Sequence, residues 1–397
     1  MPLVPADLSP VVIRAARLVD GTGAPPVTDA VLWLRDGRIA WAGPAAGLPE
    51  AAADDPVLVV EGGTILPGLV DAHVHLISMA GPDLAAEVAR PPAARVLVAV
   101  ESARRQLDSG TTLVRDLGAP AEEAVEIGRA VEAGRLDGPR VVAAGAAVTM
   151  TGGHIHYLGR VADGVEQMRL AVRENLAMGA SCIKVVATGG VLTKGIDPRR
   201  SAYAQAELDA LVSEAHRHGL KVAAHAIGEG GVVTAVRAGV DSIEHGMFLD
   251  EGAVELLRAH GTRLVPTFSA PAGILAGGAP EWIKERARPV AAAQRTSFQA
   301  AVAAGVRIVA GTDAGTPDNH HGGVAGEVAM MVGAGLDELA GIHAVTGAAA
   351  ELLGVTDRGT LTEGKAGDIL VVDGDPLTDI AALAKPAHVF QDGRRVR

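Results

Sequence analysis

Two histidines stand one residue apart in the apolar stretch "VDAHVHL" at 70–76, in a chain with only 13 histidines among 397 residues. On a β-strand, side chains at i and i+2 point to the same face, so His73 and His75 would aim two imidazoles at one point. Imidazole is the commonest metal ligand in proteins, although a hydrogen-bonded pair in a half-buried sheet has the same spacing. The pair therefore indicates either a metal site or a structural contact.

Four further polar residues interrupt apolar runs. Lys184 in "SCIKVVATGG" would be a costly buried cation without a partner. A desolvated lysine can react with carbon dioxide to give a carbamate, whose two oxygens can bridge two metal ions. His225 in "AAHAIG" and His245 in "SIEHG" could be core histidines, and Asp313 in "AGTDAGTP" could cap a turn.

The elements around these residues decide between the alternatives. From 70 to about 315, short apolar runs alternate with Ala/Glu/Arg-rich helical patterns, which is typical of βα units. The expected strands are 70–76, 111–118, 140–148, 181–189, 221–227, 242–246, 263–270 and 307–315. Eight strands predict a closed (β/α)₈ TIM barrel, whose active site lies at the C-terminal strand ends. All six candidates fall at or near such ends, which favours metal binding.

The flanks have a different pattern. Near the N-terminus, apolar residues alternate between Gly, Pro and Asp-Gly turn signals, and "GDILVVDGDPLTDI" near the C-terminus is similar. We therefore predict an α/β chain with a barrel over 67–357 and a small β-sandwich-like module formed from both chain ends, 1–66 and 358–397.

Composition excludes several function classes. The net charge of −12 argues against nucleic-acid and anionic-membrane partners, which need a basic surface. Cys182 is the single cysteine, so an intrachain disulfide is excluded and a reducing compartment is expected. The N-terminal segment lacks the pattern of a signal peptide, and no apolar run is long enough to span a bilayer. We expect a cytoplasmic protein.

The motifs together resemble the amidohydrolase superfamily, in its prolidase-like branch. This branch includes Xaa-Pro dipeptidases, related carboxypeptidases, ochratoxin-hydrolysing amidases and, more distantly, imidazolonepropionases. The resemblance rests on "RLVDGTG", "DGRIAWAG", "ILPGLVDAHVHL", "IKVVATGG", "GVDSIEHG", "GTDAGTP" and "GTLTEGKAGDILVVDGDPLTDI". It covers nearly the whole chain.

The resemblance implies a site with two divalent metal ions, usually zinc. By the family pattern, His73, His75 and Asp313 bind the more buried ion, His225 and His245 bind the more exposed one, and carboxylated Lys184 bridges them. A hydroxide held between the ions would be the nucleophile, because metal ions lower the pKa of bound water. Asp313 would accept its proton and later deliver one to the leaving nitrogen.

Another histidine is a candidate for contact with the substrate. In "VTMTGGHIHYLG", the glycine pair 152–153 would let the backbone approach a ligand and place His154 over the metals. The branch has a substrate-contacting histidine in a matching segment, so His154 is expected to stabilise the oxyanion; a loop-stabilising hydrogen bond is the alternative. Tyr157 is a weaker candidate.

One position departs from the pattern of the branch. Many of its dipeptidases carry a carboxylate-binding tyrosine two residues after the histidine of the fifth strand, where this chain has Ile227. The loop "LTKGIDPRRSAY" after the fourth expected strand offers Arg199 and Tyr203 as substitute anion anchors, although such charges are more often solvated.

The sequence thus predicts a binuclear metal-dependent amidohydrolase that cleaves an amide C–N bond of a small molecule, such as an N-acyl amino acid or dipeptide. A mononuclear deaminase or an imidazolonepropionase-like hydrolase of cyclic amides is the first alternative, and Lys184 argues against it. A non-catalytic barrel scaffold is the second, and the complete ligand set argues against that. We also expect a homo-oligomer, because the family resembled here commonly forms symmetric assemblies.

Overall fold

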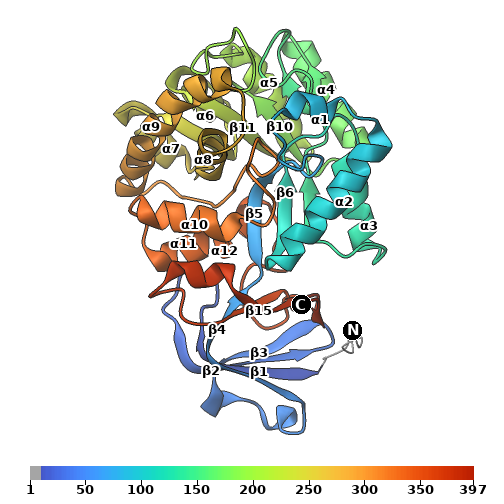
Figure 1. Ribbon diagram of the computed structural model, residues 1–397, viewed down its shortest axis with the longest axis vertical. Coiled ribbons are helices and arrows are strands. Elements are labelled where there is room, and N and C mark those ends of the chain that lie inside the picture. Colours follow the sequence, from blue (N-terminus) through green and yellow to red (C-terminus); the bar gives the residue numbers. More distant parts are fainter. Residues whose placement is uncertain (1–9) are drawn as a thin grey trace.

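The computed structural model describes residues 10–397, so the first nine residues of the expected N-terminal part, 1–66, lie outside the described residues. The chain has a mixed α/β fold, as expected (Figure 1). In the upper part of Figure 1, helices surround parallel strands, and in the lower part a sheet contains strands from both ends of the chain. The long β4 and the following β5 connect the two parts.

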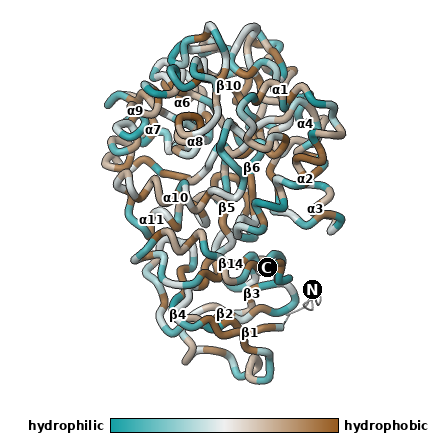
Figure 2. Tube along the Cα trace, viewed as in Figure 1, coloured by the Kyte–Doolittle hydropathy of each residue, from teal (hydrophilic) through white to brown (hydrophobic). Residues whose placement is uncertain are grey.

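The lower sheet has seven strands in the order β16-β15-β14-β4-β1-β2-β3. Only the β1–β4 pair is parallel, and the other pairs are antiparallel. The strands are β1 (Val11–Leu18), β2 (Val27–Arg35), β3 (Arg38–Pro44), β4 (Val57–Pro67), β14 (Ile369–Val372), β15 (Pro386–Gln391) and β16 (Arg394–Arg395). Their apolar residues give this sheet its own hydrophobic core, seen as brown segments in Figure 2.

The upper part contains two parallel sheets. One has the order β5-β6-β7, and the other β13-β12-β11-β10-β8-β9. Their strands are β5 (Leu69–Val74), β6 (Thr111–Asp116), β7 (Arg140–Ala143), β8 (Ala147–Thr149), β9 (Gly159–Val161), β10 (Cys182–Val186), β11 (Lys221–Gly228), β12 (Ser242–Phe248) and β13 (Arg263–Val265).

Backbone hydrogen bonds also connect these two sheets to each other. The Ser181 N–H, just before β10, donates to the Ala143 carbonyl oxygen at the end of β7, at 2.8 Å. On the other side, Ile308 forms a parallel bridge with Leu264 of β13, and the Ala72 N–H of β5 donates to the Ala310 carbonyl oxygen at 3.1 Å. The segment 306–310 therefore lies between β13 and β5.

The expected strand 140–148 is divided between β7 and β8, which belong to different sheets, and two further expectations about strands are wrong. The expected strand 307–315 is not a strand but carries isolated bridges at Ile308 and Ala314, because Asp313 has a φ of +59° and turns the backbone. The expected strand 263–270 ends at Val265, since Pro266 follows and the next residue also has a positive φ. Both departures lie at the end of the fold that carries the site.

Helices follow most of the parallel strands and bury one face on them (Figure 1). They are α1 (Leu84–Val88), α2 (Pro92–Asp108), α3 (Glu123–Glu132), α4 (Val165–Met178), α5 (Gln205–Arg217), α6 (Glu229–Ala238), α7 (Glu251–His260), α8 (Ser269–Ala276), α9 (Glu281–Ala303), α10 (Val324–Gly333), α11 (Glu338–Ala344) and α12 (Gly347–Leu352), with short 3₁₀ turns at Ala45–Gly47, Glu50–Ala52 and Ile380–Ala384. The core between helices and strands consists mostly of Ala, Val, Leu and Ile, as the 2% aromatic content requires. Over residues 10–397, no helix has the length and hydropathy that crossing a membrane needs.

Candidate metal-binding active site

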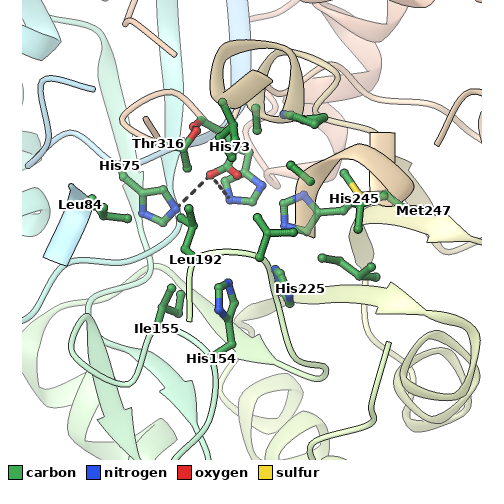
Figure 3. Close-up of a pocket in the computed structure, with 18 of the residues that line it drawn as sticks. His73, His75, Leu84, His154, Ile155, Leu192, His225, His245, Met247 and Thr316 are labelled. Carbon is green, nitrogen blue, oxygen red and sulfur yellow. Dashed lines mark hydrogen bonds and ion pairs between the residues drawn. The ribbon is translucent and has the colours of Figure 1, made fainter. Parts of the chain in front are cut away.

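Six polar side chains meet in one cavity at the carboxyl ends of the parallel strands (Figure 3). We call them the ligand cluster: His73 of β5, His75 just after it, Lys184 of β10, His225 of β11, His245 of β12 and Asp313. All six are buried. The strands thus bring together residues that span 240 positions of the sequence.

Short distances connect the members of the ligand cluster. One Asp313 carboxylate oxygen lies 3.3 Å from Nε2 of His73 and 3.2 Å from Nε2 of His75. The Lys184 Nζ lies 3.5 Å from the same His73 nitrogen. The ring centroids of His225 and His245 are 4.6 Å apart, and ligand atoms of His73, His245 and Asp313 all lie within 4.8 Å of one another. Several donor atoms therefore face a common space.

In His73 and His75, the ring nitrogen that points away from the other cluster members has a hydrogen-bond partner in the protein. Nδ1 of His73 is 2.9 Å from a Glu244 carboxylate oxygen, and Nδ1 of His75 donates to the Gly118 carbonyl at 3.0 Å. In a neutral imidazole these partners place the ring hydrogen on Nδ1, so that Nε2 is the nitrogen available toward the cluster. Such outer partners are the usual support of metal-ligating histidines.

His245 and His225 are oriented in the same manner through different atoms. Nδ1 of His245 donates to the Thr267 hydroxyl at 2.8 Å, and that hydroxyl donates to the Pro266 carbonyl at 2.7 Å. In His225 it is Nε2 that donates, to the Gly189 carbonyl at 2.8 Å. The available ligand atom is therefore Nε2 in His245 and Nδ1 in His225.

A buried ion pair between Arg115 and Glu244 lies behind His73 of the ligand cluster. Arg115 donates to Glu244 at 2.9 Å and to the Ala72 carbonyl at 2.7 Å, and both charged side chains are almost inaccessible to solvent. Burial alone would raise the pKa of Glu244, but Arg115 and the hydrogen bond from His73 lower it to about 2. The carboxylate that holds His73 is thus ionised.

Burial keeps the histidines of the cluster mostly neutral, as metal ligation requires. It lowers the pKa of His73 to about 4 and that of His225 to about 3. Burial also lowers the pKa of Lys184, to about 8. His75 differs: burial lowers its pKa, but the hydrogen bond with Asp313 and the negative charges of Asp313 and Asp116 together outweigh burial, so its pKa is raised.

The backbone is strained at the cluster. His245, Thr267 and Asp313 have φ values of +77°, +55° and +59°. Non-glycine residues rarely adopt this conformation, and such strain concentrates at functional sites. Here two of the three strained residues belong to the ligand cluster, and the third orients His245.

His154 reaches the same cavity from the loop between β8 and β9 (Figure 3). Its ring centroid lies 4.9 Å from that of His225. The ring rests on Gly190, where an added Cβ would lie 2.2 Å from Nε2, so only glycine fits there. The predicted proximity of His154 to the metal-ligand candidates matches this geometry.

The hydrogen bonds of Thr193 are compatible with a tautomer of His154 that carries its ring hydrogen on Nε2. The Thr193 hydroxyl oxygen accepts from the Ile155 N–H at 3.1 Å and lies 3.0 Å from His154 Nδ1. With its oxygen occupied as an acceptor, the hydroxyl can donate its proton to Nδ1. The His154 Nε2 then carries the ring hydrogen on the cavity side.

The rest of the cavity is lined mainly by aliphatic side chains, which we call the apolar wall. Leu84, Ile155, Leu158, Val191, Leu192 and Ile227 form one part of it. Met247, Ala270, Pro271, Ile274, Ala287 and Val290 form the other. The cavity has an empty volume of about 660 Å³, including its mouth to solvent. This space suits a small molecule.

Three substrate-binding candidates from the sequence lie outside the cavity lining. The Tyr203 hydroxyl donates to the Ala162 carbonyl at 3.1 Å, within the core. Arg199 is exposed and lies over the Phe248 ring, 5.8 Å from its centroid. Tyr157 lines a neighbouring hollow next to Lys194. The structure therefore does not bring them to the ligand cluster.

The sequence reasoning missed the supporting residues Glu244, Arg115, Thr193 and Thr267. A signal existed for the first two, because Glu244 directly precedes His245 in a buried strand and Arg115 interrupts "TTLVRDLG". Charged residues inside buried strands need partners. No comparable signal marks the two threonines, since their roles depend on loop conformation.

The donor set fits divalent metal ions. Imidazole nitrogen atoms and a carboxylate oxygen converge, the other ring nitrogens are held by hydrogen bonds, and the side chains are buried. Zinc prefers this mixture of nitrogen and oxygen ligands. The buried Lys184 lies beside the same donor atoms, with its Nζ 3.5 Å from Nε2 of His73.

Comparisons with known proteins agree with this geometry. Residues 64–396 match the amidohydrolase family. Ochratoxinase from Aspergillus niger is 30% identical over 96% of this chain and 86% of its own length. An imidazolonepropionase from Saccharopolyspora erythraea is 32% identical over 59% of this chain and 62% of its own.

Solved structures give the same result. A Xaa-Pro dipeptidase with methionine bound in its active site superposes with a TM-score of 0.90 at 31% identity, over 98% of this chain and 100% of that one. The structure of A. niger ochratoxinase gives a TM-score of 0.88 at 29% identity, over 98% and 96%. The resemblance to the prolidase-like branch expected from the motifs is thereby confirmed.

Proposed function

Because the chain belongs to the amidohydrolase family, in its prolidase-like branch, and is therefore a hydrolase of carbon–nitrogen bonds, we propose that it cleaves an amide bond of a small molecule with two divalent metal ions. The observation that carries this proposal is the ligand cluster, whose donor atoms face one space while their other atoms are held by the protein. Such preorganisation is the general requirement of a metal site.

The ligands divide into two sets. In our proposal His73, His75 and Asp313 hold one ion, and the distances from the Asp313 oxygen to both histidine nitrogens support this set. His225 and His245 hold the other, and their adjacent rings support that set. Lys184, as a carbamate, would supply oxygen ligands to both ions, and zinc is the metal that these ligands would favour.

The same proposal includes the architecture that holds the ligands. The segment 306–310, through its backbone contacts with β13 and β5, would complete a closed (β/α)₈ barrel over 67–357. The ends of the chain, 1–66 and 358–397, would form the separate sandwich-like β module. Ligands at carboxyl strand ends are what this architecture leads one to expect.

In this proposal Asp313 and His154 have different roles in the reaction. When bound, the metal ions would activate a water molecule and polarise the amide carbonyl. Asp313 accepts a proton from the attacking water and donates it to the leaving nitrogen, so that the amine departs neutral. His154 donates its Nε2 hydrogen to the carbonyl oxygen as negative charge develops there. Water thus adds across the C–N bond to give a carboxylic acid and an amine.

A hydrolysis screen tests this function. Chelated protein and the same protein reloaded with zinc would be offered linear acyl amides, N-acyl amino acids, dipeptides, lactams and aminated heterocycles, with products identified by mass spectrometry. We expect zinc-dependent cleavage of linear amides. Ring opening or deamination alone would favour the imidazolonepropionase-like or deaminase alternative, and no turnover of any compound would favour a non-catalytic scaffold.

A further inference from the structure

The apolar wall is part of the packed interior of the protein. Ile274 and Ala287 pack in a hydrophobic cluster that Val191 and Leu192 contact. A second cluster contains Ile227, Met247 and Val290, and Val191 also contacts it. Because these clusters continue behind the cavity, the wall has a fixed aliphatic surface, part of which Figure 3 displays around the histidines.

The nearby cationic side chains are bound to other parts of the protein. Arg286 donates to the Gly190 carbonyl at 2.8 Å and to the Val191 carbonyl at 3.2 Å, so its guanidinium holds the loop rather than facing the cavity. Lys194 lies over the Trp282 ring, 5.0 Å from its centroid. Neither side chain lines the cavity.

Polar groups are scarce along the wall itself. Within residues 10–397, the charged or titratable side chains that line the cavity are those of the ligand cluster and His154. The lining also contains one hydroxyl, that of Thr316, which donates to the Asp313 carbonyl at 2.8 Å. A substrate group that rests on the apolar wall therefore meets no lysine or arginine side chain outside the ligand cluster among residues 10–397.

These surroundings discriminate between substrate groups by charge. An ionised carboxylate loses its hydration in an aliphatic pocket and needs a paired cation to compensate. An alkyl or aryl group gains from the same transfer, by about fourfold in binding for each buried methylene. The wall therefore favours neutral, apolar groups beside the scissile bond.

From the wall we propose that the substrates of this site are neutral hydrophobic amides that lack a carboxylate next to the scissile bond, such as N-acyl derivatives of apolar amines. This inference rests on the proposed function and narrows its substrate class away from N-acyl amino acids and dipeptides. Hydrolysis of such a substrate consumes one water molecule and releases a carboxylic acid and an apolar amine.

A matched pair of substrates tests the inference. N-(3-phenylpropanoyl)pyrrolidine and N-(3-phenylpropanoyl)-L-proline share one amide and differ in a single carboxylate. With the zinc-loaded protein, we expect kcat/KM for the neutral member to exceed that for the acid by about 100-fold, the loss expected for an unpaired buried charge. Equal or faster cleavage of the acid would overturn the inference while leaving the proposed function intact.

A substitution in the wall tests which residues cause the preference. Ile227→Arg places a cation in the wall and should shift the ratio toward the acid by about tenfold or more, whereas Ile227→Met should leave it unchanged. Val290→Lys serves as a second variant if circular dichroism finds Ile227→Arg unfolded. An unchanged ratio in a folded cationic variant would contradict the role of the wall.

A binding measurement separates failure of the function from failure of the inference. If zinc-loaded protein cleaves neither compound, the proposed function fails for this amide. The Kd values of both compounds for chelated wild-type protein, from calorimetry, then decide the inference. Tighter binding of the pyrrolidine supports it, and equal or tighter binding of the proline derivative overturns it.

Discussion

The ligand cluster and the apolar wall line the same cavity but are built in opposite ways. Each histidine of the cluster has a hydrogen-bond partner, and a buried carboxylate and guanidinium lie directly behind His73. The wall has aliphatic side chains that pack in hydrophobic clusters. Polar groups in a dry interior must be satisfied individually, whereas aliphatic groups need only be packed.

This difference suggests a division of labour in the cavity. Changes in the cluster should affect the chemical step for every substrate, because they alter the groups that act on the amide. Changes in the wall should affect which substrates bind, because they alter contacts with the substrate groups that flank that amide and do not react. Variants of the cluster, of His154, and of the carboxylates that hold the cluster and the wall separate the two effects.

The largest effect is expected from Asp313→Asn. This change removes the proton acceptor, so kcat should fall by about 100- to 10,000-fold for every substrate, with little change in relative preference. Steady-state kinetics on two substrates that differ in their apolar groups would measure this. The control is Asp36→Asn, an exposed residue in the turn between β2 and β3. Loss for only one of the two substrates would contradict the division of labour.

His154→Phe should have the next largest effect. His154 lies where the cluster meets the wall, and loss of its Nε2 donor should lower kcat by about 100- to 1,000-fold. His156→Phe is a matched control in the same loop, since its Nδ1 donates to the Gly153 carbonyl and its ring does not line the cavity. A His154 variant with normal kcat but altered substrate preference would assign this residue to the wall.

Glu244→Gln tests the support behind the cluster. The change removes the negative charge that orients His73 and pairs with Arg115, so metal affinity should fall by about 10- to 100-fold. Zinc affinity can be measured by competition with a chelating dye. Glu255→Gln on the exposed face of α7 is the control. Unchanged zinc affinity would mean that the cluster does not depend on this carboxylate.

The smallest effect is expected at Glu327 of α10, which supports the wall. Its carboxylate accepts from the Phe268 and Ser269 N–H groups, both at 2.7 Å, where α8 begins. Burial raises its pKa from 4.5 to about 7. The folded protein therefore holds this proton more tightly than the unfolded chain does, so the stabilisation is present below about pH 4.5 and is lost as the pH rises through about 7.

Glu327→Gln should remove this pH dependence. The difference in the free energy of unfolding between about pH 5 and about pH 8 should be smaller in the variant than in the wild type, as measured by urea denaturation. The exposed Glu255→Gln variant should retain the wild-type difference. If the Glu327 variant also retains it, the carboxyl group does not titrate in this range.

The sequence predicted the cluster better than the wall for a physical reason. His73, His75 and Lys184 are conspicuous because polar residues in buried strands need an explanation, and strand periodicity gives their direction. The aliphatic residues of the wall resemble ordinary core positions. Ile274 and Val290, for example, fit the apolar face of a helix, and only the tertiary structure reveals that they also face a cavity.

Loops account for most of the remaining differences. The expected strand at 307–315 has an apolar start, but the positive φ of Asp313 and the turn after it cannot be deduced from hydropathy. The direction of Arg199 and the partner of Tyr203 likewise depend on the conformation of a long loop. Side-chain direction follows from sequence spacing only within regular elements.

The central claim is that the ligand cluster holds two metal ions that the Lys184 side chain helps to bridge. The most direct test is a zinc titration of chelated protein, with bound zinc counted by mass spectrometry under native conditions, in the wild type and in Lys184→Met. We predict two tightly bound ions per wild-type chain and fewer than two in the variant, with amide hydrolysis rising until the second ion binds. A wild type that reaches full activity with one ion or none, or a variant that still binds two ions tightly, would contradict the account.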